Sequence, residues 1–244
     1  MTEASRVVPE IADAPGAIPS PNIWRWPQVY ELANDCLDRA GVIDSAIARS
    51  GGWDGADVLD VGCGSGFHLP RFAATARSVI GVEPHAPLAA LARERVAAAG
   101  LRNVGVGVAS AQDSGLADRS VDVAHARWAY FFGPGCEPGL SELGRVVRPG
   151  GAAYVVDVDA TRSTFGEWFR GAWPRYDPAA VDRFWSRAGW SRERLTVTLE
   201  APDAADFAAV VRLEFAAAYA DRVLAADPLR RSVDYAVTLR WRRF

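Results

Sequence analysis

The sequence predicts an α/β fold in which helices cover both faces of a mostly parallel, doubly wound sheet. Short apolar, valine-rich segments at 57–61, 78–82, 103–109, 121–127 and 151–158 alternate with segments of helical character. Strands that alternate with helices form parallel sheets with right-handed crossovers. Such sheets bind their ligands outside the carboxyl ends of the strands, so functional residues are expected at that edge.

The predicted helices follow from proline near a first turn and glycine after a last turn. Pro87 to Ala99 shows the second signal clearly, because Gly100 closes it. The other expected helices span 28–40, 42–49, 67–76, 139–147, 164–173, 178–188 and one or two segments within 204–226. Two later segments alternate as strands, at 194–199 and 235–242.

The segment 58–68 is the one around which the chain is organised. Its first four residues predict a short buried strand, and Gly62, Gly64 and Gly66 follow at a spacing of two. Glycine permits positive φ and lets backbone approach a ligand closely. The following helix start offers free N–H groups to an anionic group. These glycines would also suit a simple tight turn, but strand, glycine turn and helix together favour cofactor binding.

A second carboxylate strengthens this interpretation. Glu83 ends the second predicted strand, about where a βαβ unit places the acid that binds a ribose. The glycine spacing is G-x-G-x-G, with Phe67 next, and therefore departs from the G-x-G-x-x-G dinucleotide fingerprint. A surface position for Glu83 is the structural alternative, and its place at a strand end favours ribose binding.

These motifs resemble those of the class I S-adenosylmethionine (SAM)-dependent methyltransferases. Residues 60–66 match the first motif of that family and 81–84 the second. The adenine contact corresponds to 110–112, the start of the fourth strand to 121–123 and the turn before the fifth strand to 148–151, all in family order. The resemblance covers roughly 55–160. It implies a seven-stranded sheet with an antiparallel last strand, and SAM as cofactor. Ser110 departs from the pattern, because many members carry an acid there.

The resemblance also implies a set of cofactor-binding residues: Asp60, Gly62, Cys63, Gly64, Gly66, His68, Glu83, Pro84, Ser110, Ala111, Gln112, Ala126, Arg127 and Trp128. Asp60 would support the loop and the cofactor's amino group, and the backbone at 126–127 would lie near the methionine part. Trp128 would cap that part or belong to the core. His68 would approach the cofactor carboxylate or serve packing, and His85 would border the adenine or lie on the surface.

Catalysis by such an enzyme depends first on alignment, since the methyl group of a sulfonium is already electrophilic. Orientation supplies roughly 7–11 kcal/mol in favourable systems, and a general base adds about 10²–10⁴-fold where a proton must leave. The candidate catalytic residues are His125 and Tyr130, followed by Asp157 and His68. His125 lies inside a predicted strand, which favours a satisfied core histidine. No compact ligand set such as H-E-x-x-H occurs, so no metal is expected.

Two aromatic-rich segments flank the predicted sheet. We expect a tail over 1–21 and a single methyltransferase domain over 22–244, in which 22–50 forms a helical lid and 160–190 a helical cover. Trp24 and Tyr30 are the candidate substrate-binding residues. A lid of this kind would favour an apolar or aromatic small molecule and exclude water. The alternative is that these aromatic residues pack helices onto the sheet.

Composition excludes several classes of protein. All 27 basic residues are arginine, which rules out a Walker A loop, a pyridoxal phosphate Schiff base and lysine nucleophiles. A net charge of -3 does not indicate the basic surface that a nucleic-acid-binding domain usually has. Three scattered cysteines indicate a reducing cytoplasm, and neither a signal peptide nor a membrane span is expected.

The sequence thus predicts a cytoplasmic, SAM-dependent methyltransferase that acts on a small molecule mainly through proximity and orientation. Two alternatives remain open at this stage. A SAM-binding protein without methyl transfer would carry the same loop and acid. A nicotinamide-dependent oxidoreductase would also use a Rossmann domain, although the glycine register and the turn at 148–151 argue against it.

Overall fold

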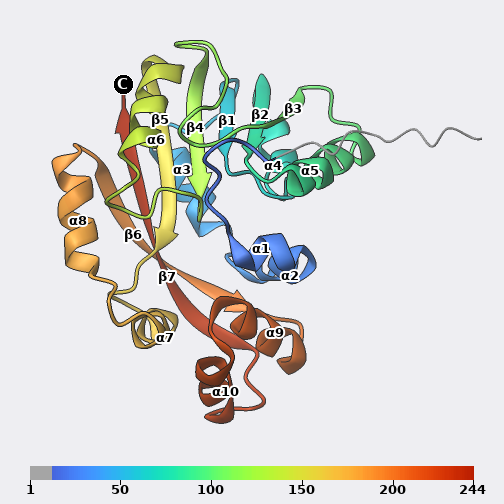
Figure 1. Cartoon of the computed structure of the whole chain (residues 1–244), viewed down its shortest axis with the longest axis vertical. Helices are drawn as coiled ribbons and strands as arrows, with labels where there is room; N and C mark the ends of the chain where they lie inside the picture. The colour runs from blue at the N-terminus through green and yellow to red at the C-terminus, as the bar shows by residue number, and fades with distance from the viewer. Residues whose placement is uncertain (1–12) are drawn as a thin grey trace, which may run out of the picture.

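The computed structural model of the protein describes residues 13–244. Seven strands form one sheet (Figure 1): β1 Asp57–Val61, β2 Ser78–Glu83, β3 Val104–Val108, β4 Val121–Arg127, β5 Val147–Val158, β6 Ser191–Glu200 and β7 Ser232–Arg243. Their order across the sheet is β3-β2-β1-β4-β5-β7-β6. Strands β1 to β5 run parallel to one another, and β7 runs antiparallel to both β5 and β6. The predicted fold class is therefore confirmed, including its antiparallel last strand.

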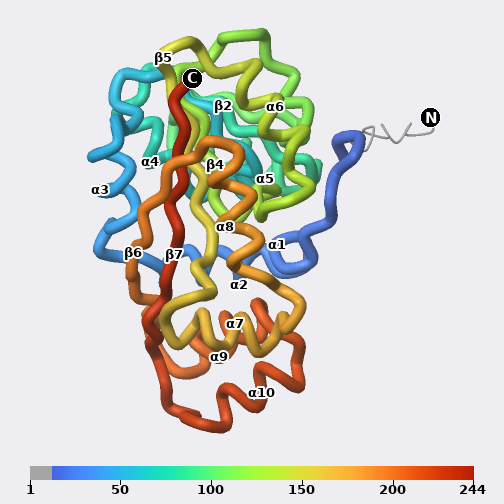
Figure 2. Tube along the Cα trace, turned by 90° about the vertical axis from the view of Figure 1, so that its left-hand side faces the viewer, coloured from blue at the N-terminus to red at the C-terminus, as the bar shows by residue number. Residues whose placement is uncertain are grey.

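The described helices are α1 Pro21–Arg25, α2 Pro27–Cys36, α3 Val42–Arg49, α4 Leu69–Ala73, α5 Ala86–Ala98, α6 Glu137–Val146, α7 Thr164–Ala172, α8 Pro178–Arg187, α9 Ala204–Glu214 and α10 Ala217–Ala225. Helices α3 and α6 lie on opposite sides of the sheet, as Figure 2 shows. Helices α1 and α2 lie between the carboxyl ends of the parallel strands and α9 (Figure 1).

The alternation of side chains along the strands divides the interior into two apolar clusters. Val58 faces the cluster that contains Ile47 of α3 and Phe72 of α4. The next residue, Leu59, faces the other cluster, which contains Leu143 of α6 and Trp185 of α8. Because successive side chains of a strand point to opposite faces, β1, β2, β4 and β5 each contribute to both clusters. This double burial explains the near-continuous apolar character of these strands.

Several boundaries differ from those that the sequence predicts, and α1 is absent from the prediction. Helix α2 ends at Cys36 instead of 40, because Leu37 forms a bridge with Leu199 of β6 and the chain then turns at Asp38, with φ 56°. Strand β5 begins at Val147, four residues before its predicted start, since Val147 already pairs with Val121 across an irregularity. Turn geometry and sheet pairing set these ends, and neither is visible in local periodicity.

The predicted tail over 1–21 lies partly outside the described residues. From Asp13 onward the chain makes specific contacts: the Ala14 amide donates to the Pro84 carbonyl at 2.8 Å. Oδ1 of Asp13 accepts a hydrogen bond from the Ala86 amide at 2.8 Å and lies 2.9 Å from Nδ1 of His85. The end of this segment is therefore held beside the turn that follows β2.

Candidate functional site

The glycine loop folds tightly around the end of β1. The amides of Gly62 and Cys63 both donate to the Val82 carbonyl, at 2.8 and 3.0 Å. Gly62 and Gly64 have φ values of 71° and 57°. A Cβ at Gly62 would lie 2.5 Å from Cβ of Ala129, and one at Gly64 would lie 2.8 Å from Cδ1 of Ile23. Close approach of the turn after β4 requires glycine at 62, and the left-handed backbone favours glycine at both positions.

The Glu83 carboxylate joins this loop to the turn after β2. Its Oε2 accepts from the Gly64 amide and its Oε1 from the His85 amide, each at 3.0 Å. The side chain is buried, and burial raises the pKa of Glu83 to about 7. The group thus sits at the strand end as predicted, with its two oxygens oriented by two backbone donors and with acceptor capacity remaining for a ligand hydroxyl.

A cavity of about 410 Å³ opens beside this loop. Most of the predicted cofactor-binding residues line it, namely Gly62, Cys63, Gly64, His68, Glu83, Pro84, Ser110, Ala111, Gln112, Arg127 and Trp128. Three predicted residues do not line it, namely Asp60, Gly66 and Ala126. Asp60 is buried behind the loop, where its Oδ1 lies 2.9 Å from Nδ1 of His125. Gly66 faces Ala92 of α5.

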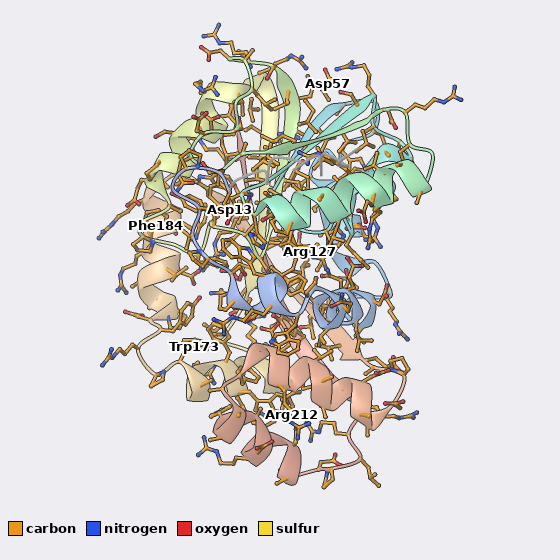
Figure 3. All side chains as sticks on the ribbon, turned by 45° about the vertical axis from the view of Figure 1, so that its right-hand side comes forward. Asp13, Asp57, Arg127, Trp173, Phe184 and Arg212 are labelled. Atoms are coloured by element: carbon orange, nitrogen blue, oxygen red, sulfur yellow. The ribbon has the colours of Figure 1, made fainter. Side chains whose placement is uncertain are left out.

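Arg127 is a positive group in the wall of this cavity. Among the described residues, its Nε has no hydrogen-bond partner although the atom is buried, and the side chain forms no ion pair. Its guanidinium lies 4.7 Å from the centre of the Trp128 ring, and burial lowers its pKa. Figure 3 shows Arg127 between the N-terminal helices and the sheet. An unpartnered buried guanidinium fits a ligand carboxylate, which would pair with it.

His68 lines this cavity, and His85 contacts Trp24, which also lines it. Burial lowers the pKa of His68 well below its usual range, so a neutral imidazole lines the loop end. The His85 ring stacks on Trp24, with ring centres 4.0 Å apart and 10° between the planes. Trp24 lines the smaller cavity and is not part of the larger one described below. Trp24 therefore lies beside His85, and its role in substrate binding stays a prediction.

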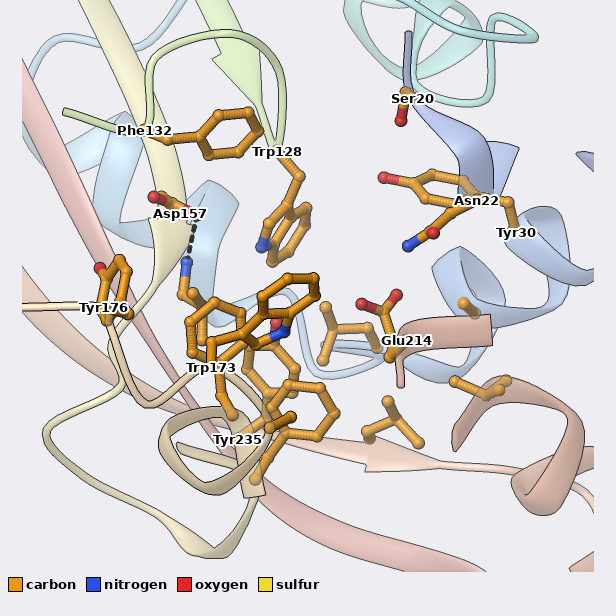
Figure 4. A pocket seen from close by; sticks show the side chains of 18 of the residues that line it. Ser20, Asn22, Tyr30, Trp128, Phe132, Asp157, Trp173, Tyr176, Glu214 and Tyr235 are labelled. Carbon is orange, nitrogen blue, oxygen red and sulfur yellow. Dashed lines mark hydrogen bonds between the residues drawn. The ribbon is translucent and has the colours of Figure 1, made fainter. Parts of the chain in front are cut away.

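A larger cavity of about 980 Å³ continues from the first one (Figure 4). Residues that line both are Ser20, Asn22, Tyr30, Asn34, Trp128, Phe132 and Trp173. The walls are mainly aromatic: Tyr30 comes from α2, Phe165 and Phe169 from α7, and Tyr235 from β7. Tyr30, the other predicted substrate residue, thus lines both cavities, and the segment 160–190 supplies part of the wall of the larger one.

Several residues of the larger cavity escape sequence reasoning. Glu214 ends α9, and Tyr235 and Leu199 come from the antiparallel strands, far along the chain from the glycine loop. A weak signal for Glu214 exists, because it is an acid between Leu213 and Phe215 in an otherwise apolar run. Periodicity alone does not show which cavity such a residue faces.

Of the candidate catalytic residues, His68 and His125 are neighbours, with ring centres 6.3 Å apart. His125 is buried in β4, lines neither cavity, and packs against Phe72 with ring centres 4.9 Å apart. Tyr130 lines the smaller cavity with φ 54°, and its hydroxyl lies 3.4 Å from the Gly135 carbonyl. Asp157 lines the larger cavity. Within residues 13–244, no group of three or more His, Cys, Asp or Glu side chains is placed to hold a metal ion.

The sheet order, the glycine loop and the strand-end acid together define a class I methyltransferase fold. Residues 58–151 match the family model described as a methyltransferase domain. This segment is therefore a methyltransferase domain, and S-adenosylmethionine is the cofactor that such a domain implies. The residues around the smaller cavity fit that cofactor, because the Glu83 carboxylate can accept hydrogen bonds from hydroxyl groups and the unpartnered Arg127 guanidinium can pair with a carboxylate.

Individual relatives support the same family. The malonyl-[acyl-carrier protein] O-methyltransferase of Pectobacterium atrosepticum is 28% identical over 156 residues, covering 62% of this chain and 58% of the relative. The protein-L-isoaspartate O-methyltransferase of Koribacter versatilis is 38% identical over 112 residues, covering 43% of this chain and 50% of the relative. The chain thus spans about half the length of the curated relatives it matches.

Among solved structures, a SAM-dependent methyltransferase from Aquifex aeolicus is similar over 87% of this chain and 97% of its own, with a TM-score of 0.54 and 19% identity. At that identity the likeness concerns the fold. Among the described helices, none has the length and apolar character that crossing a bilayer requires.

Proposed function

We propose that this protein transfers the methyl group of SAM to a small molecule bound in the larger cavity. The observation that carries the proposal is the shared wall of the two cavities. Tyr30, Trp128 and Trp173 line both, so a cofactor in the smaller cavity and an acceptor in the larger one would meet between these rings. Pockets that join in this way hold two reactants in contact without a gap for bulk water.

The smaller cavity supplies the groups that would hold the cofactor. Glu83 would accept hydrogen bonds from the ribose hydroxyls, because its oxygens are already oriented by the Gly64 and His85 amides. Arg127 would pair with the carboxylate of the methionine part. The stacked Trp24 and His85 would border the adenine. When bound, the cofactor supplies a methyl group activated by the positive sulfur.

The larger cavity would orient the acceptor and exclude water from it. Its aromatic wall is built from three distant parts of the chain, which leaves little freedom for an apolar ligand to reorient. Orientation of this kind contributes roughly 7–11 kcal/mol in favourable systems. We assign His125 to the support of Asp60, with which it pairs at 2.9 Å, and Tyr130 to the wall of the cofactor cavity.

The proposal includes the location and the partners of the protein. Three free cysteines are compatible with a reducing cytoplasm, and the net charge of -3 does not favour nucleic acid. We therefore propose a cytoplasmic enzyme whose partner is an apolar or aromatic small molecule, with neither nucleic acid nor membrane as substrate.

Calorimetric titration with S-adenosylhomocysteine tests the cofactor half of this proposal, and methyl transfer to a panel of small molecules tests the other half. We expect saturable binding and a product that carries one additional methyl group. Absence of binding at millimolar S-adenosylhomocysteine would refute the proposed function. Binding without transfer to any acceptor in the panel would favour a SAM-binding protein that does not turn over.

A further inference from the structure

The larger cavity contains a carboxyl group that the proposed methyl transfer leaves unexplained. Glu214 is the last residue of α9, and its side chain lines the cavity. Figure 4 shows its carboxylate directed towards the space between Trp173, Trp128 and Tyr30. Among residues 13–244, the Glu214 carboxylate accepts no hydrogen bond and forms no ion pair. Burial raises its pKa to about 7, so it is poised between its neutral and ionised forms.

A second carboxyl group lines the same cavity. Asp157 of β5 is 4% exposed, and its Oδ1 accepts from the Val158 amide at 2.7 Å. Its other oxygen has no partner among the described residues. Burial raises the pKa of Asp157 to about 6, although Arg240 opposes that shift. In Figure 4, Asp157 and Glu214 lie on opposite sides of Trp128.

Within the described part of the chain, the cations near this cavity leave Glu214 without a counter-ion. Arg175 is the basic residue that lines it, and this side chain is exposed at the rim. Arg127 lines the smaller cavity. Arg240 lines neither cavity; its Nη2 lies 3.4 Å from Asp182, and its charge lowers the pKa of Asp157. The remaining titratable groups that face Glu214 are the phenols of Tyr30 and Tyr235. A carboxylate without a counter-ion, surrounded by aromatic faces, is the arrangement that binds an organic cation.

We propose that the larger cavity binds a ligand with a positively charged nitrogen on an apolar or aromatic body, and that Glu214 is the counter-ion of this nitrogen. This inference deepens the proposed function and rests on it, because the ligand would be the methyl acceptor. The rings of Trp128, Trp173 and Tyr235 would contact the cation through their faces. Asp157 would add a second negative charge on the far side of Trp128. Neither acid lines the cofactor cavity, which assigns both to the acceptor.

The test uses the full chain saturated with S-adenosylhomocysteine and three probes of similar size. Phenethyltrimethylammonium carries a permanent positive charge, 3-phenylpropanol is neutral, and 3-phenylpropionate is negative. We expect the cation to bind at least about tenfold more tightly than either of the others, which corresponds to about 1.4 kcal/mol. Equal or tighter binding of the neutral or negative probe would overturn the inference.

Glu214→Gln identifies the group responsible, with Glu200→Gln on the exposed end of β6 as the matched control. Since Glu214 has no partner, the amide should fold normally, and circular dichroism checks this. We expect the variant to lose about tenfold or more in affinity for the cation and little for phenylpropanol. An unchanged preference for the cation in a folded variant would overturn the role of Glu214.

The pH dependence separates this site from alternatives. Because the probe does not titrate, tighter binding at pH 8 than at pH 6, by up to about tenfold, would report ionisation of the cavity carboxyls. Glu214→Gln should remove most of this dependence, whereas Glu200→Gln should keep it. A Glu214→Gln protein that loses affinity for SAM but not for S-adenosylhomocysteine would instead show that the acid serves the sulfonium, and would overturn the inference. Failure of S-adenosylhomocysteine to bind the wild type would reject the proposed function itself, which keeps the two outcomes distinct.

Discussion

Replacement of Glu83 by glutamine tests the cofactor site most directly. The wild-type carboxylate accepts from the Gly64 and His85 amides at 3.0 Å. Glutamine keeps one accepting oxygen and presents an NH₂ group where the second oxygen stood, so one amide loses its partner. The ligand's ribose also loses a charged acceptor. A hydrogen bond to a charged group contributes about 1.5–3 kcal/mol, so loss of the bond from the ribose should weaken S-adenosylhomocysteine binding by about 10- to 150-fold.

The stability of the ligand-free protein should respond differently. Burial raises the pKa of Glu83 to about 7, so its ionisation in the folded protein is unfavourable by about 3 kcal/mol relative to an exposed glutamate. At pH 8 glutamine avoids this cost and loses about 1 kcal/mol for one hydrogen bond. The free energy of unfolding should therefore stay equal or rise while affinity falls.

Calorimetry at pH 8 measures the affinity, and urea unfolding measures the stability. Glu94→Gln, at an exposed position of α5, is the matched control and should change neither. Wild-type affinity in a folded Glu83→Gln protein would refute the ribose assignment. A Glu83→Gln protein that unfolds would refute the expectation that the substitution leaves the free energy of unfolding equal or higher at pH 8.

Three further predictions address the cavity wall, the buried acids and the N-terminal helices. Arg127→Met should weaken S-adenosylhomocysteine by about tenfold or more but leave 5′-methylthioadenosine, which has no carboxylate, almost unaffected; equal losses for both in calorimetry would contradict a carboxylate-binding role. The ligand-free protein should become less stable to urea between pH 5 and pH 8, because Glu83, Asp157 and Glu214 hold protons in this range that the unfolded chain has released. His68 is neutral in the folded protein, so below pH 6.5 it makes the free energy of unfolding rise with pH and offsets the effect of one of the three acids. A free energy of unfolding that rises from pH 5 to pH 8 would show that the acids are already ionised in the folded protein. Glu31→Gln should loosen α2, because Glu31 accepts hydrogen bonds from Arg95 at 2.6 Å and from Ser65. We expect faster proteolysis after Arg25 or Arg39, and an unchanged rate would show that this ion pair does not hold α2 in place.

The cofactor half of the site could be predicted from sequence because its parts are local. The glycine loop, Glu83 and the turn at 110–112 each follow a strand directly, and parallel strands bring their carboxyl ends to one edge. Nothing beyond the order of strands and helices is needed to place them together. The role of Arg127 was less visible, because its importance comes from the absence of a partner, which only packing reveals.

The acceptor half could not be predicted in the same way. Tyr235 and Glu214 reach the cavity because β7 inserts between β5 and β6, and because β6 and β7 extend past the parallel strands to carry α9 (Figure 1). These are pairings between segments separated by tens of residues, and local periodicity contains no information about them. The aromatic character of 160–190 was visible, but whether each ring faces the core or a cavity depends on that same topology.

The helix α2 connects the two halves, and this has a consequence for specificity. Glu31 contacts Ser65 of the glycine loop, while its neighbour Tyr30 lines both cavities. Burial and the nearby Glu214 raise the pKa of Tyr30, so its phenol stays protonated and can donate a hydrogen bond towards either cavity. A cofactor that fixes the glycine loop would therefore also fix the wall against which the acceptor packs. Acceptor binding should then strengthen when S-adenosylhomocysteine is present, and linkage requires the acceptor to strengthen S-adenosylhomocysteine binding by the same factor.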